Sequence, residues 1–196
     1  MKKNRGRPKA FDENEVLYLA MNYFWEHGYD STNLENLLEA MTIKKSSFYA
    51  TFKSKEEVFS KAISLYREES LLALNKLKDD IGPKNTLLGL VAMVVDEFRQ
   101  TGSVKGCLIV NSSKECYKTH SGLSKQLIHE FAYMMTIFKQ YIDEAKDKGE
   151  ITNPLQTDLL AGRFASSLNG MVVMIQTGAD EDFIDDLVLS IQELLY

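Results

Sequence analysis

Helical periodicity is the feature of this sequence that most limits how the chain can fold. Nearly every long segment repeats its apolar residues at helical spacing, and no segment alternates strictly between apolar and polar residues. Three prolines and eleven glycines are fewer than a turn-rich β protein would carry. With 44% hydrophobic residues in 196, the chain can bury a proper core. We therefore expect an all-α fold of about nine helices.

Three short helices are expected first, followed by longer ones. Asp12 and Glu15 form a capping-box pattern for the first helix, and Gly28 suits its end. Ser31 or Thr32 would cap the second helix. The third helix is expected at about 43–52, and a longer one from the Ser54–Glu57 capping box to about Leu77; the others fall at about 85–100, 107–118, 122–148, 155–177 and 180–195.

The charges are unevenly distributed along the chain. The formal net charge is −5, yet residues 1–55 hold nine Lys or Arg against seven Asp or Glu, whereas residues 56–196 hold fourteen against twenty-one. Five of the first ten residues are basic and none is acidic. A localised basic patch on an acidic chain indicates a polyanionic partner. The alternative is a solvated surface helix and a charged tail without a specific role.

One stretch carries a more specific signal. The sequence STNLENLLEAMTIKKSSFYATFKSKEEVF, at residues 31–59, resembles the helix-turn-helix of the TetR-type repressors. The likeness lies in Thr32 at the start of the second helix, the short turn AMTI, the aromatic run FYATF and the continuation F-x-S-K-E-x-x-F. One subgroup is also similar across GRPKAFD and FWEHGYDSTNL. The resemblance is specific over residues 11–66 and weaker beyond them.

Two positions depart from the family pattern. Thr42 stands in the turn where the family usually has Gly, and Leu38 stands where it usually has a small Ala. Thr42 would have to adopt a conformation that glycine reaches at lower cost. The substitution therefore bears on the exact geometry of the turn and leaves the helix-turn-helix motif intact.

The resemblance implies DNA contacts by two groups of residues. The first group would bind phosphates, from a helix N-terminus or from side chains beside the groove: Thr32, Tyr49, Lys53 and Lys55. The second group would face base edges in the major groove: Lys44, Lys45, Ser46 and Ser47. Lys45 is the best candidate for a guanine contact, worth about 1–3 kcal/mol. For Tyr49, packing alone is the alternative.

The basic N-terminus is expected to act as an arm. The sequence RGRP, at residues 5–8, is the core of the AT-hook, in which glycine lets the backbone approach the minor-groove floor and proline keeps the chain extended. Next to a helix-turn-helix, such an arm would read the adjacent minor groove. We expect Arg5 and Arg7 to insert at an A·T-rich step. A tail that adds only nonspecific charge is the alternative.

The resemblance also implies two domains. Residues 1–55 would form the DNA-binding helix-turn-helix domain with its arm, and residues 56–196 a helical domain for dimerisation and ligand binding. Small residues in the eighth helix and an apolar side of the last helix suit a two-fold homodimer with a four-helix interface from residues 155–195. Ordinary intrachain core is the alternative. The expected interface residues are Ala161, Ala165, Leu168, Ile184, Leu187, Val188 and Ile191.

A small-molecule inducer is the second expected partner of this domain. Methionine side chains suit a site that accepts varied shapes, although aromatic residues and methionines at helical spacing also fit a plain core. The candidate lining residues are Phe98, Cys107, Tyr117, Phe131, Met134, Met135, Phe138, Asn169 and Met174.

The two cysteines leave a further hypothesis open. The sequence GCLIVNSSKEC, at residues 106–116, resembles a segment in one branch of these repressors, some of which sense electrophiles or oxidants through cysteine. Cys107 would lie near a helix N-terminus, which favours the thiolate. The alternative is two small buried hydrophobic residues. Cys116 and His120 alone supply too few ligands for a metal, so neither a metal nor a cofactor is expected.

Other classes of protein fit less well. The N-terminus lacks an apolar signal-peptide core, and the longest apolar run, LLGLVAMVV, is far shorter than the roughly 20 residues that span a membrane. We therefore expect a cytoplasmic protein. Because P-loop, dinucleotide-binding, G-x-S-x-G and H-E-x-x-H motifs are absent, an enzyme is not expected. A helical adaptor that does not bind DNA would leave the basic residues at 2–9 and 44–55 unexplained.

The prediction is thus a DNA-binding transcriptional regulator. We expect a ligand-responsive homodimeric repressor that binds a palindromic operator in double-stranded DNA through the helix at about 43–49. A regulator of the same fold that senses oxidants or electrophiles through cysteine is the closest alternative.

Overall fold

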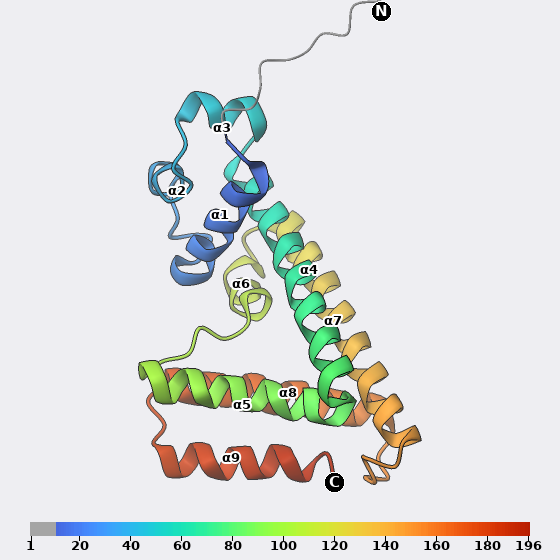
Figure 1. Cartoon of the computed structure of the whole chain (residues 1–196). Helices are drawn as coiled ribbons and strands as arrows, with labels where there is room; N and C mark the ends of the chain where they lie inside the picture. The colour runs from blue at the N-terminus through green and yellow to red at the C-terminus, as the bar shows by residue number, and fades with distance from the viewer. Residues whose placement is uncertain (1–10) are drawn as a thin grey trace, which may run out of the picture. The chain divides into compact units, whose positions relative to one another are not determined.

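The computed structural model describes residues 11–196, and over this range it confirms the all-α prediction with nine helices and no strand. The arm residues Arg5 and Arg7 lie outside the described range. The chain divides into two compact units, one ending at Arg67 and the other comprising Glu68–Tyr196 (Figure 1). Within residues 11–196, no helix has both the length and the apolar character needed to cross a membrane.

The first unit contains the three short helices that the sequence predicted. They are α1 (Glu13–His27), α2 (Leu34–Ala40) and α3 (Lys45–Thr51), and the unit is completed by the first part of α4 (Lys55–Ile81). The carboxylate of Asp12 caps α1 by accepting a hydrogen bond of 2.8 Å from the N–H of Asn14. The prediction for α2 was wrong by one or two residues, because Asn33, rather than Ser31 or Thr32, is its N-cap.

Aromatic rings fill the core of the first unit. Phe24, Phe48, Phe52 and Phe59 are each at most 1% exposed. The ring of Phe59 stands edge-on to that of Phe24, with centroids 4.9 Å apart. Because Phe59 belongs to α4, the first turns of this helix complete the core. The division between the units accordingly lies within α4, further along than the sequence-based boundary at residues 55 and 56, where α4 begins.

The second unit contains the end of α4 and five further helices. They are α5 (Pro83–Thr101), α6 (Leu108–Cys116), α7 (Ser121–Asp147), α8 (Thr157–Gln176) and α9 (Glu181–Glu193). Helices α5, α8 and α9 lie side by side, and α7 packs against α5, α6 and α8 (Figure 1). Their shared core gathers large apolar residues such as Leu87, Ile142 and Phe164. The five predicted helical ranges match α5 to α9 to within a few residues.

Candidate nucleic-acid interface

The turn between α2 and α3 sets the orientation of α3 relative to α2. The N–H of Thr42 donates to the carbonyl of Glu39 over 3.0 Å, and the N–H of Ile43 donates to the carbonyl of Leu38 over 3.2 Å. Thr42 has φ 53°, which makes it the one residue other than glycine with positive φ in the described part of the chain. The left-handed conformation expected at this position is therefore confirmed.

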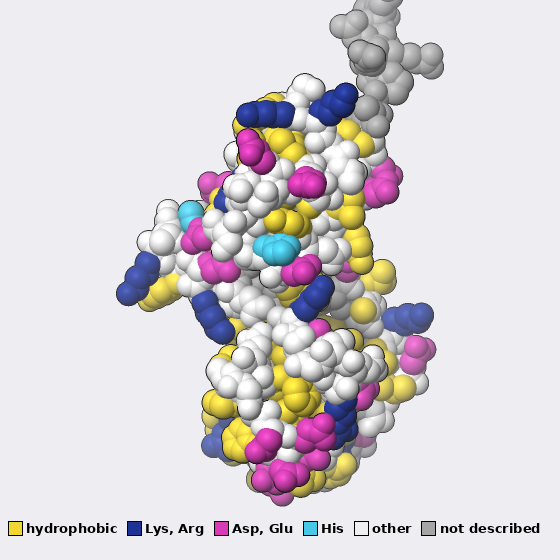
Figure 2. Space-filling model, turned by 90° about the vertical axis from the view of Figure 1, so that its left-hand side faces the viewer, with side chains coloured by type: hydrophobic (Ala, Val, Ile, Leu, Met, Phe, Trp, Pro, Cys, Tyr) yellow, Lys and Arg dark blue, Asp and Glu magenta, His cyan; other side chains and the backbone are white. Residues whose placement is uncertain are grey.

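Helix α3 is buried on one face and exposed on the other. Phe48 anchors the inner face and is 0% exposed. On the outer face, Lys44, Lys45 and Ser46 are exposed and Ser47 is half-buried. Basic side chains, which are lysines in this part of the chain, stand out at the end of the first unit that carries α3 (Figure 2). The four side chains expected to face base edges are thus positioned by one buried phenylalanine.

Two of the predicted phosphate contacts lie beside this face. Tyr49 is 54% exposed, and its ring stands edge-on to Phe48 with centroids 5.3 Å apart. Lys53 is also exposed. Both side chains are therefore available to a polyanion at the surface of the unit. Phe48 fills the core at this point, and Tyr49 stays exposed.

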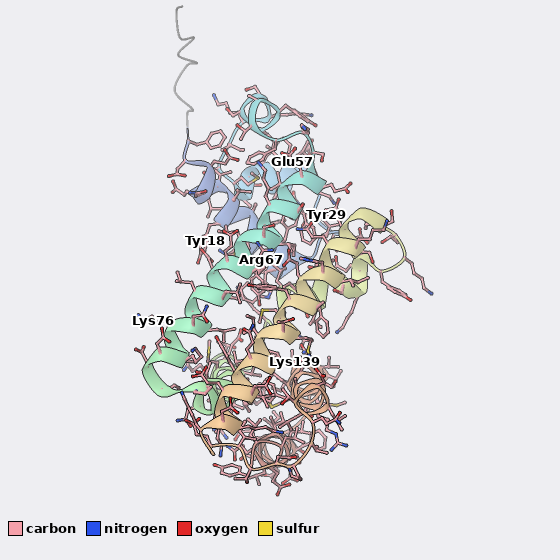
Figure 3. The ribbon with its side chains drawn as sticks, turned by 90° about the vertical axis from the view of Figure 1, so that its right-hand side faces the viewer. Tyr18, Tyr29, Glu57, Arg67, Lys76 and Lys139 are labelled. Carbon is pink, nitrogen blue, oxygen red and sulfur yellow. The ribbon has the colours of Figure 1, made fainter. Side chains whose placement is uncertain are left out.

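The predicted capping box at the start of α4 is present, but its second hydrogen bond comes from the residue before the cap. The hydroxyl of Ser54 accepts a hydrogen bond of 3.1 Å from the N–H of Glu57. Glu57 lies in the first turn of α4 (Figure 3). Its carboxylate in turn accepts from the N–H of Lys53, one residue before the cap, over 2.9 Å. This hydrogen bond is the main reason why the pKa of Glu57 lies below its ordinary value, and Lys61 adds to the effect.

Thr32 and Lys55 make internal contacts. Thr32 is 1% exposed, its hydroxyl donates to the carbonyl of Gly28 over 2.6 Å, and its N–H donates to Tyr29. The ammonium group of Lys55 donates to the carbonyls of Tyr29 and Thr32 over 2.8 and 2.7 Å and lies 4.1 Å from the Tyr29 ring centroid. Thr32 therefore has no surface to present to a phosphate, and Lys55 braces α4 against the loop between α1 and α2. The sequence offered no signal for this brace, because it joins a lysine to backbone carbonyls far away in the chain.

In the second unit, four of the seven residues expected at a dimer interface lie in the chain's own core. Ala161, Ala165, Ile184 and Ile191 are at most 3% exposed. Leu168, Leu187 and Val188 are half-buried and pack against the same core. Ala161 and Ala165 thus accommodate neighbouring helices of the same chain, and the outer faces of α8 and α9 carry other residues.

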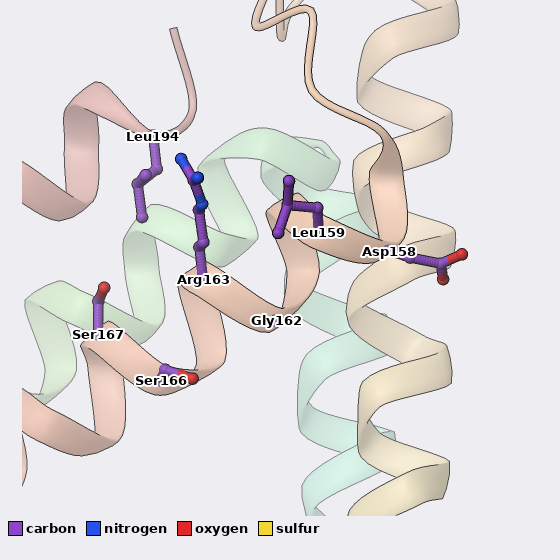
Figure 4. A pocket seen from close by; sticks show the side chains of 7 residues that line it. All are labelled: Asp158, Leu159, Gly162, Arg163, Ser166, Ser167 and Leu194. Carbon is purple, nitrogen blue, oxygen red and sulfur yellow. The ribbon is translucent and has the colours of Figure 1, made fainter.

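The outer face of α8 has an open hollow of about 440 Å³ (Figure 4). At Gly162, an added Cβ would meet no atom within 4 Å, so the helix backbone is bare at this point. The side chains around the hollow combine opposite charges, hydroxyl groups and two leucines, and they come from α8 and from the residue after α9: Asp158, Leu159, Arg163, Ser166, Ser167 and Leu194.

The residues expected to line a ligand site are spread over several environments. Phe138 is buried in the core, whereas Phe98, Met134 and Met135 are half-buried against it. The amide of Asn169 donates to the carbonyl of Ala165 over 2.7 Å. Three others are exposed at the surface: Tyr117, Phe131 and Met174. None of the candidates lines the hollow on α8.

The two cysteines lie at opposite ends of α6. Cys107 is the N-cap and is half-buried, which places it at a helix N-terminus as expected, while Cys116 is fully buried at the end of the helix. The loop before Cys107 is tightly fitted: Gly106 has φ 71°, and an added Cβ would lie 2.7 Å from Cγ1 of Val172. Only glycine fits this position without rearrangement of α8.

Comparisons with known proteins match both units of the chain to bacterial regulatory proteins. The family model of bacterial regulatory proteins of the tetR family matches residues 16–62, and the model of the tetracyclin repressor-like C-terminal domain matches residues 83–189. The HTH-type transcriptional repressor ComR of Escherichia coli (strain K12) is 27% identical over 181 residues, covering 91% of this chain and 86% of ComR. The uncharacterized HTH-type transcriptional regulator YezE of Bacillus subtilis (strain 168) is 28% identical over 186 residues, covering 93% of this chain and 95% of YezE.

A solved structure adds a relative bound to DNA. The TetR family transcriptional regulator CifR, as a cysteine mutant in complex with a 26 bp double-strand operator, superimposes with a TM-score of 0.76 at 26% identity. The match covers 97% of this chain and 98% of CifR.

Proposed function

Because the chain belongs to the TetR family of bacterial regulatory proteins, we propose that it is a ligand-responsive homodimeric repressor whose α3 enters the major groove of a palindromic operator. The chain is a DNA-binding transcriptional regulator, as its relatives are. The observation that carries the proposal is the outer face of α3, where Lys44, Lys45 and Ser46 are exposed above the buried Phe48. A helix that presents such donors from a rigid base suits direct contact with base edges.

The homodimer part of the proposal follows from the small size of α3. A helix of 7 residues contacts few bases, so two copies spaced by roughly 34–36 Å are needed to read successive major grooves. We place the interface on the outer faces of α8 and α9, which carry exposed apolar side chains such as Leu159, Phe183 and Leu189. The hollow around Gly162 offers room for a side chain of the partner.

The ligand part of the proposal concerns the second unit. A molecule that binds one spacing of the two α3 helices better than another shifts the protein between DNA-bound and free forms. Moving from mostly bound to mostly free takes about 5.5 kcal/mol of differential affinity. Phe98 and Met134, half-buried beside the core, are the candidate contacts for such a molecule. Cys107, half-buried at the N-cap of α6, would serve the alternative in which an electrophile or oxidant is the signal.

The decisive experiment selects bound sequences from a random pool of duplex DNA and then measures affinity for the selected duplex against salt concentration. Each phosphate neutralised contributes about −0.9 to the log–log slope, so Lys53→Met, which removes one expected phosphate contact from each protomer of the dimer, should reduce the slope by about 1.8 and weaken binding. Lys76→Met is the matched control, because Lys76 is an exposed lysine of α4 in the second unit (Figure 3). Failure to select any duplex, or equal behaviour of the two variants, would contradict the proposal.

A further inference from the structure

Thr42 has an unfavourable backbone conformation that no hydrogen bond of its side chain to the described part of the chain offsets. Its φ of 53° lies in the left-handed region, which is disfavoured for residues with a Cβ and most of all for β-branched residues. The side chain is exposed. Strain at a position of this kind persists where the surroundings, or a function, require the residue.

Most threonine hydroxyls of the chain donate to an acceptor within the protein, and over the described residues that of Thr42 does not. The sequence has ten threonines, and eight of them donate their hydroxyl to an acceptor of the protein. Within residues 11–196, the hydroxyls of Thr42 and Thr51 have no such partner, and of the two residues Thr42 is the exposed one. A threonine commonly satisfies its hydroxyl on the preceding helical turn, and the conformation of Thr42 removes it from that pattern.

The backbone N–H groups of Thr42 and Ile43 are already used in hydrogen bonds within the chain. Its N–H and that of Ile43 close the end of α2 on the carbonyls of Glu39 and Leu38. The hydroxyl is therefore the hydrogen-bond donor of Thr42 that remains for a partner outside the chain. It lies two residues before Lys44, the N-cap of α3, on the segment that leads to the exposed basic face.

We propose that Thr42 is an additional DNA-contacting residue, whose hydroxyl donates a hydrogen bond to a phosphate oxygen beside the groove that α3 enters. The inference rests on the proposed function, because it needs α3 to lie in the groove. Threonine hydroxyls are regular donors to the DNA backbone, and such contacts fix the register of a recognition helix. The bound phosphate would then offset the strain that the free protein carries.

A purely geometric role for the turn makes the opposite prediction. Glycine adopts positive φ without strain, so if the turn mattered only through its shape, Thr42→Gly would preserve or improve DNA binding. If the hydroxyl is a contact, the same variant gains stability and loses affinity. The two quantities, measured together, therefore separate the two roles.

The experiment compares Thr42→Gly, Thr42→Val and Thr42→Ser by urea denaturation and by affinity for the selected duplex. We expect Thr42→Gly to raise the denaturation midpoint and yet weaken binding by about a hundredfold or more, because each of the two protomers loses a hydrogen bond to a charged group. Thr42→Val keeps the branched shape, so its midpoint should stay near that of the native chain while its affinity falls equally. Thr42→Ser should bind like the native chain. Because a hydroxyl is uncharged, none of the three should change the salt slope, in contrast to Lys53→Met.

A second measurement identifies the contact itself. Single phosphates of the selected duplex are replaced by methylphosphonates, which are neutral and accept hydrogen bonds poorly. One replacement should weaken the native chain and leave Thr42→Val unaffected. The inference is overturned if Thr42→Gly binds as tightly as the native chain, or if every replacement weakens Thr42→Val as much as the native chain. A native chain that selects no duplex would instead overturn the proposed function.

Discussion

At the scale of single residues, one ammonium group holds two segments of the first unit together. Lys55 donates to the carbonyls of Tyr29 and Thr32 and lies over the Tyr29 ring. Hydrogen bonds to a charged group contribute about 1.5–3 kcal/mol each, and partial exposure reduces this. We therefore expect Lys55→Met to lower the free energy of unfolding by about 1–3 kcal/mol in urea denaturation followed by circular dichroism.

Lys53→Met provides the control, because it removes the same charge from an exposed side chain two residues away. A surface substitution of this kind should change stability by less than about 0.5 kcal/mol. Equal loss of stability in the two variants would show that the brace contributes nothing beyond its charge.

At the scale of helices, the start of α4 predicts a dependence of stability on pH. The hydrogen bond from the N–H of Lys53 lowers the pKa of Glu57 below its ordinary value of 4.5. A carboxylate with a lowered pKa stabilises the fold above the ordinary value, and the stabilisation is lost as the pH falls through the folded-state pKa. The stability of the native chain relative to Glu57→Gln should therefore be constant near neutral pH and shrink below about pH 4.5, in urea denaturation between about pH 7 and pH 3.

The comparison with Glu56→Gln isolates this effect. Glu56 is exposed in the same turn of α4, so its replacement removes the same charge from the same helix end. A pH-dependent difference of equal size in both variants would mean that the helix terminus, rather than the contact with Lys53, is responsible.

Helix ends were predictable where the stabilising contact is local. Asp12 and Ser54 each accept from an N–H two or three residues away, so the pattern of a few neighbours contains the whole interaction. The cap of α2 was missed because three residues that can cap a helix, Ser31, Thr32 and Asn33, follow one another. The hydroxyl of Thr32 donates to the carbonyl of Gly28, and Asn33 is the cap. Sequence spacing does not reveal which of several capable side chains has another partner.

At the scale of the whole molecule, periodicity identified apolar faces without identifying what covers them. Ala161 and Ile184 have the spacing of an interface, and within this chain they are fully covered by neighbouring helices. For α3, the sequence indicated which residues are exposed, because the buried Phe48 defines the inner face of the helix and thereby its outer face. A dimer interface therefore has to be sought among the residues that the fold leaves exposed. The pattern of a single sequence does not distinguish these exposed apolar residues from those of the core.

Gly162 allows the proposed homodimer to be tested without damage to the fold. A Cβ added there would meet no atom of another part of the chain within 4 Å, and replacing glycine favours the helix. In a two-fold interface on the outer face of α8, the variant Gly162→Gln inserts two side chains at once. At about 1–3 kcal/mol of overpacking for each, the dissociation constant should rise by roughly 30-fold or more in sedimentation equilibrium. Ala132→Gln, at an exposed position of α7 away from this face, should leave the dimer intact, and a dimer of Gly162→Gln as tight as the native one would place the interface elsewhere.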